Sequence, residues 1–93
     1  MPSLLSRLYK QASKQNITKN TLTNEYYGSR DISYIRQIIS VIIYNETRTP
    51  FSDISKAVGY KDKHEVLKHA RRYREDPSFR SDVDNFHARS LLG

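Results

Sequence analysis

The chain has 93 residues, which is enough for one small core of helices but too short for a cofactor-binding sheet plus a substrate domain. Its 16 Lys and Arg against 10 Asp and Glu give a net charge of +6 and an isoelectric point near 9.7, which favours a polyanionic partner, nucleic acid ahead of an anionic membrane surface. The absence of cysteine excludes disulfides and thiolate metal sites, and the longest apolar run, from Ile38 to Tyr44, is far below the ~20 residues that cross a bilayer.

The pattern of apolar residues predicts a single all-α domain over residues 1–93. The first segment begins at a possible N-cap, Ser3, and its apolar residues form one helical stripe, consisting of Leu4, Leu5, Leu8 and Ala12. A second, short helix is expected after Thr18.

A long central helix is predicted from about Asp31 to Glu46, although the isoleucines and valine of this segment favour strands. The isoleucines recur at the i, i+3, i+4, i+7 spacing of an amphipathic helix and do not alternate strictly. Tyr34, Val41 and Tyr44 fall off the main stripe. They either cover another helix or form a surface for a partner.

A helix-turn-helix is predicted at about residues 50–75. Thr49 and Pro50 favour a helix start with proline at the first helical position, and Gly59 favours a helix end. Asp62 can then cap the next helix, with Glu65 completing a capping box. A closing helix at about 78–91 follows Pro77, and its apolar positions are Phe79, Val83, Phe86 and Leu91.

The second helix of this pair separates apolar from cationic residues. Its packing side is expected to hold Val66, Leu67, Ala70 and Tyr73, and its other side Lys61, His64, Lys68, Arg71 and Arg72. In a helix-turn-helix the N-terminal part of the second helix enters the major groove, which places Lys61, Lys63, His64 and Lys68 as candidate readers of phosphates and base acceptors. A solvated charged face is the alternative.

Three motifs in this order resemble one known family. They are Arg36-Gln37 on the long helix, FSDISKAVG from Phe51, and YKDKHEVLKHARR from Tyr60. Together they resemble the C-terminal DNA-binding domain of the bacterial replication initiator DnaA, a helical domain of the Trp-repressor-like class. The resemblance implies binding of double-stranded DNA.

The resemblance also implies roles for individual residues. Arg36 matches the arginine that enters the minor groove, and Arg30, in the turn before the long helix, is placed to contact phosphate. In the recognition segment Lys61 replaces an arginine and Asp62 keeps the aspartate. The family's base readers are replaced by Lys63, His64, Glu65 and Lys68, and Glu65 is interpreted as part of the helix cap. Arg71 and Arg72 extend the cationic side.

Enzymatic and metal sites are not expected. His64 and His69 are five residues apart and point in different directions on a helix, and His87 stands alone as a surface residue. The sequence lacks a glycine-rich phosphate loop, so neither a bound nucleotide nor another cofactor is expected.

Two function classes remain open. The first is a DNA-binding module that regulates replication or transcription, encoded by a phage or mobile element and acting in the cytoplasm of a bacterium or of a phage-infected bacterial cell. The second is an interaction or structural module, without sequence-specific DNA reading, that binds a protein partner or forms a homo-oligomer through Val41 and Tyr44 or the N-terminal helix.

Overall fold

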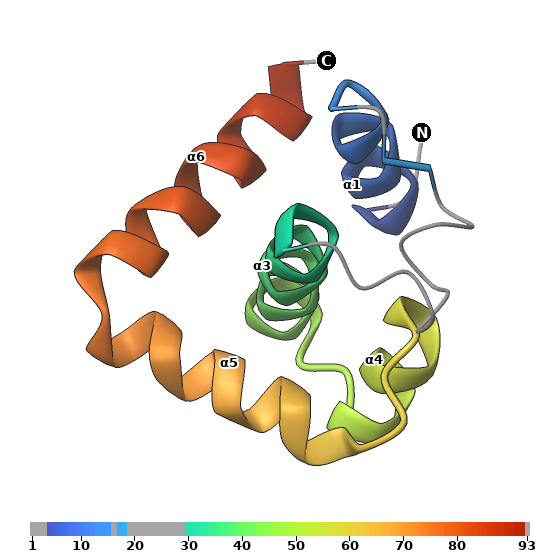
Figure 1. Cartoon of the computed structure of the whole chain (residues 1–93), viewed down its shortest axis with the longest axis vertical. Helices are drawn as coiled ribbons and strands as arrows, with labels where there is room; N and C mark the ends of the chain where they lie inside the picture. The colour runs from blue at the N-terminus through green and yellow to red at the C-terminus, as the bar shows by residue number, and fades with distance from the viewer. Residues whose placement is uncertain (1–3, 16, 19–29, 93) are drawn as a thin grey trace.

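A computed structural model describes residues 4–15, 17–18 and 30–92 (Figure 1). These residues form five α-helices and no strand, which confirms the all-α prediction. The helices are α1 (Leu4–Ser13), α3 (Arg30–Thr47), α4 (Phe51–Val58), α5 (Lys63–Glu75) and α6 (Pro77–Leu92). The predicted cap at Ser3, the short helix after Thr18 and the turn before Arg30 lie outside the described residues.

Helix α3 is the centre of the fold, and the other four helices pack around it (Figure 1). Its residues 38–43 are all buried, so the helix is enclosed on every side over this stretch. Ile39 and Val41 have no exposed surface. Val41 therefore covers other helices, and the alternative prediction that it lies on a partner surface is wrong.

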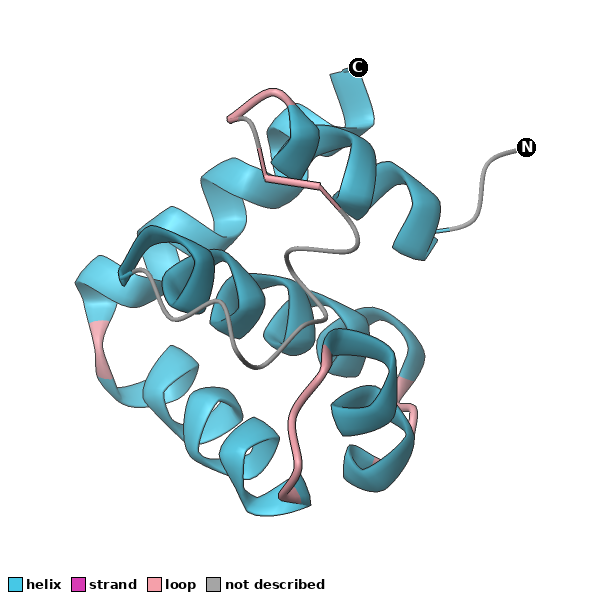
Figure 2. Cartoon of the chain, turned by 45° about the vertical axis from the view of Figure 1, so that its right-hand side comes forward, coloured by secondary structure: helices cyan, strands magenta, loops and turns pink. Residues whose placement is uncertain are grey.

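Helix α4 begins and ends at residues with well-defined backbone geometry. Pro50 is the N-cap, with φ −56° and ψ 144°, so the helix starts at Phe51, one residue later than predicted. Gly59 ends it with φ 89°, a conformation in which a Cβ atom would clash, and the Gly59 N–H donates to the Ser55 carbonyl at 3.0 Å. The short loop after Gly59 leads directly into α5 (Figure 2).

Helix α5 is capped by Asp62, whose carboxylate accepts from the His64 N–H at 2.9 Å. Asp62 is thus confirmed as the N-cap, but the predicted capping box does not form, because Asp62 accepts from the second residue of the helix and not from the Glu65 N–H at the third. The Glu65 carboxylate contacts Lys68 and His69 instead of the Asp62 N–H. The next cap, Asp76, accepts from the N–H groups of Ser78 and Phe79 and starts α6 at Pro77.

Helix α6 closes the core against α1, α3 and α5. Phe79, Val83 and Phe86 are its buried apolar residues, as predicted, whereas Leu91, the fourth predicted apolar position, is 57 % exposed. Helix α1 packs on α3 and α6 through Leu8 and Ala12, away from the outer side of α5 (Figures 1 and 2). Within the described part of the chain, no helix is both long enough and apolar enough to cross a membrane.

Candidate nucleic-acid interface

The exposed side of α5 is cationic along most of its length. Val66, His69 and Ala70 are buried against the core, and the opposite side exposes Lys63, His64, Lys68 and Arg71. The predicted division of α5 into a packing side and a cationic side is thus observed, with Leu67 and Tyr73 half-buried at its edges. Core packing leaves these cations pointing to solvent from a fixed helix.

A hollow of about 460 Å³ extends this surface across the connection between α4 and α5. The residues lining it are Ser52, Ser55, Lys56, Tyr60, Lys61, Asp62 and Lys63. Lys56 was not among the predicted site residues. It lies in the last turn of α4, three residues before Gly59. This position next to the turn could have predicted that Lys56 lies near Lys61. Its cation joins those of the connection and of α5.

We call the exposed cationic set the DNA face, because it is the candidate surface for DNA. It consists of Lys56, Lys61, Lys63, His64, Lys68 and Arg71. The Lys68 ammonium lies 3.3 Å from the Glu65 carboxylate, and both side chains are well exposed. An exposed pair of this kind contributes little to stability. Lys68 can therefore exchange Glu65 for a phosphate at small cost.

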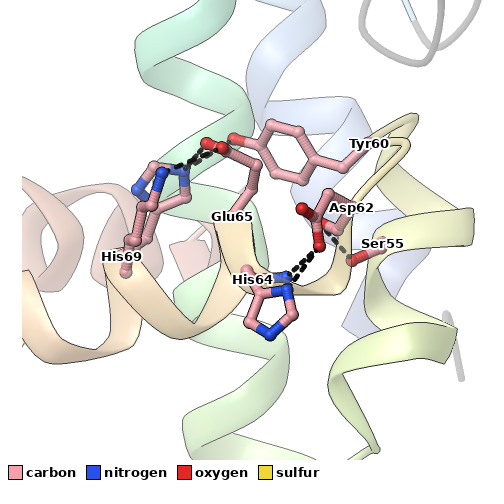
Figure 3. Close-up of polar contacts among 7 residues, drawn as sticks. Ser55, Tyr60, Asp62, His64, Glu65 and His69 are labelled. Atoms are coloured by element: carbon pink, nitrogen blue, oxygen red, sulfur yellow. Dashed lines mark hydrogen bonds and ion pairs between the residues drawn. The ribbon is translucent and has the colours of Figure 1, made fainter.

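Asp62 and His64 are held together at the start of α5 (Figure 3). The Asp62 carboxylate accepts from the His64 N–H and lies 2.7 Å from Nδ1 of the His64 ring. These contacts, the backbone hydrogen bond first, lower the pKa of Asp62. Asp62 is therefore occupied as a helix cap, and it holds the His64 ring on the exposed side of the helix.

Arg36 lies inside the protein. Only 7 % of its surface is exposed, and its guanidinium lies 5.7 Å from the centre of the Tyr60 ring. The expected role in a minor groove needs an exposed side chain. In this conformation the Arg36 guanidinium instead packs against the Tyr60 ring, in the connection between α4 and α5.

Behind the DNA face, three side chains of the connection and α5 converge (Figure 3). The Tyr60 hydroxyl lies 3.1 Å from Nε2 of His69, and a Glu65 carboxylate oxygen lies 3.9 Å from the same nitrogen. Burial lowers the pKa of His69 and raises that of Tyr60. Sequence reasoning missed this cluster, although His69 follows buried Val66 by three positions on the same helix. His64 and His69 do point apart, as predicted.

The Arg72 side chain makes its contacts within the protein. Its Nη1 donates to the Gln37 side chain at 3.1 Å, its Nε donates to Asp76 at 3.2 Å, and its guanidinium lies 4.6 Å from the centre of the Phe79 ring. These contacts join α5 to α3 and α6. Arg30 is the first residue of α3, and its expected phosphate contact lies outside the described side chains.

Comparisons with protein-family models, with curated proteins and with solved structures find no match to this chain. Function is therefore inferred from the DNA face itself.

Proposed function

We propose that this chain binds double-stranded DNA, with α4 and α5 acting as a helix-turn-helix and α5 as the recognition helix. The observation that carries the proposal is the DNA face, on which five Lys or Arg side chains and one His from α4, the connection and α5 are exposed together. Such a set neutralises backbone phosphates and releases their counterions, which is the main source of affinity for DNA.

The geometry of α5 supports insertion into a major groove. The helix is about 20 Å long at 1.5 Å per residue, and a major groove about 12 Å wide admits one helix. Asp62 caps its N-terminus and the buried side is anchored on α3 and α4, so little ordering remains to be done on binding.

Site-specific reading is proposed for Lys63 and His64, which stand at the N-terminus of α5. This is the part of a recognition helix that reaches base edges. The resemblance to the initiator domain supports a role in regulating replication or transcription, in the cytoplasm of a bacterium or of a phage-infected cell. The proposed role is binding, and it needs no cofactor or nucleotide.

The interaction module is less well supported at the first of its two predicted surfaces. Val41 is fully buried, and the half-buried Tyr44 packs its ring 4.7 Å from that of Phe51. The second predicted surface, the N-terminal helix α1, keeps exposed positions for a protein partner. Loss of partner binding without loss of DNA binding on α1 substitution would favour this module.

Salt-dependent binding to a duplex tests the proposal. We expect a log–log slope of about −4 to −5, corresponding to roughly 0.9 for each of about five neutralised phosphates. The double variant Lys68→Gln/Arg71→Gln should reduce the magnitude of the slope by about 2. Lys10→Gln/Lys14→Gln removes the same charge from the exposed surface of the α1 region and should leave the slope unchanged. Absence of binding at low salt, or equal losses in both variants, would reject the proposal.

A panel of duplexes then separates base reading from backbone binding. If Lys63 reads a base, Lys63→Ala should reduce discrimination among sequences by about 1–3 kcal/mol. A uniform loss over all duplexes would mean that Lys63 contacts phosphates only.

A further inference from the structure

A second hollow, of about 290 Å³, lies between the end of α3 and the second half of α5. The residues lining it are Tyr44, Asn45, Arg48, Ala70, Tyr73 and Arg74. None of them belongs to the DNA face as defined above. Ala70 is buried, while Asn45 and both arginines are exposed, so polar groups stand at the opening.

The chemistry of this hollow suits an anion. Arg48 and Arg74 come from two different elements, and the side-chain amide of Asn45 adds a neutral donor. No carboxylate is found among the described residues that line it. The Tyr73 hydroxyl donates to Asp84 at 2.7 Å, which leaves the Tyr73 ring as a wall. The planar guanidinium groups of two arginines that line one hollow suit the oxygens of a phosphate.

The backbone of Arg48 indicates that its side chain has a specific use. Its φ is 55°, in the left-handed region that disfavours residues with a Cβ atom, and glycine or asparagine would fit this helix end more easily. The guanidinium lies 5.0 Å from the centre of the Tyr44 ring, at the opening of the hollow. An exposed cation–π contact is weaker than the backbone penalty, so stacking alone does not explain an arginine here.

The position of the hollow along α5 indicates which anion it would meet in a complex with DNA. Arg74 follows Lys63 by about three helical turns, or about 16 Å at 1.5 Å per residue. The major groove is about 12 Å wide and about 8.5 Å deep. When the N-terminus of α5 lies in the groove, Arg48 and Arg74 are beyond the bases and can meet only the sugar–phosphate backbone. We propose that this hollow binds one backbone phosphate at the rim of the groove, an inference that rests on the proposed binding of duplex DNA.

The charge-removing variant Arg48→Asn/Arg74→Gln tests this site. Asparagine accepts φ 55° and glutamine suits a helix, so the variant should keep the wild-type circular dichroism spectrum and melting temperature. On a duplex of about 16 base pairs, we expect the salt slope to fall in magnitude by about 0.9, as for the loss of one phosphate contact. Arg48→Lys/Arg74→Lys keeps the charges and should retain the slope, and Lys10→Gln/Lys14→Gln again serves as the control.

The outcomes separate the rim site from the proposed function. If wild type binds no duplex, the proposed function fails. If Lys68→Gln/Arg71→Gln reduces the slope but Arg48→Asn/Arg74→Gln behaves like the α1 control, only the rim site is overturned.

Discussion

The Tyr60 hydroxyl lies 3.1 Å from Nε2 of His69, so the connection after α4 is tied to the buried side of the proposed recognition helix. Charged groups surround this pair on several sides. Glu65 approaches His69 along α5, Arg36 of α3 lies over Tyr60, and Lys68 and Arg72 add positive charge nearby. Burial is the largest effect on the His69 ring, and it lowers the pKa of that ring from its usual 6.5.

The lowered pKa of His69 predicts a pH-dependent stability. The unfolded chain binds this proton more tightly than the folded chain, so the free energy of unfolding should be largest above about pH 7 and should decrease as the pH falls through about 6.5. Urea unfolding between about pH 5 and pH 8 measures the slope. His69→Gln should flatten it.

Lys63→Gln is the matched control, because it changes an exposed side chain of the same helix and leaves the contacts of His69 with Tyr60 and Glu65 in place. It should retain the wild-type slope between about pH 5 and pH 8. Asp62 and Asp76 also have lowered pKa values, and they stabilise the fold only above the acidic range in which they protonate. Identical slopes in wild type and His69→Gln would contradict the prediction.

Arg72 and its neighbour Arg71 should have opposite effects on stability and binding. Arg72→Ala removes contacts with Gln37, Asp76 and Phe79 and should destabilise the fold by about 1–2 kcal/mol. Arg71→Ala, at an exposed position, should change stability by less than about 0.5 kcal/mol but reduce the salt slope for DNA by about 0.9. Chemical denaturation and anisotropy separate the two effects. A large loss of slope in folded Arg72→Ala would assign Arg72 to DNA as well.

Arg36 is expected to stabilise the fold. Because its side chain is buried against Tyr60, Arg36→Ala should cost about 1–3 kcal/mol, and Arg36→Met should recover part of this by keeping an apolar stem. Thermal unfolding provides the measurement. Unchanged stability combined with weaker binding to A·T-rich duplexes would instead support the minor-groove role expected from the sequence.

Gly59 should be hard to replace. Gly59→Ala places a Cβ atom at φ 89° and should cost about 1–2 kcal/mol. Gly59→Asn should cost less, because asparagine tolerates the left-handed region. Denaturant midpoints of the two variants give the comparison, and an alanine variant as stable as the asparagine variant would argue against the clash.

The helices were predictable because each one carries its signal locally. The spacing of Ile35, Ile39 and Ile42 gave one stripe at the helical period, which outweighed the strand propensity of isoleucine. Gly59, Asp62 and Pro77 marked ends and starts by backbone rules that act over a few residues. Two local predictions were wrong in detail. Pro50 stands one residue before α4 instead of inside it, and the Glu65 carboxylate contacts Lys68 of its own helix instead of the Asp62 N–H.

The composition of the DNA face depended on tertiary structure. The charges of Arg36, Arg71 and Arg72 are equivalent in the sequence, yet Arg36 lies under Tyr60, Arg72 is bound to Gln37 and Asp76, and only Arg71 remains on the face. Some of these partners lie on other helices, up to 35 positions away in the chain. The amino-acid sequence alone therefore determined that α5 is a capped, amphipathic, cationic helix. Packing between helices decided which of the cations can reach a phosphate, because accessibility depends on neighbours that local patterns do not reveal.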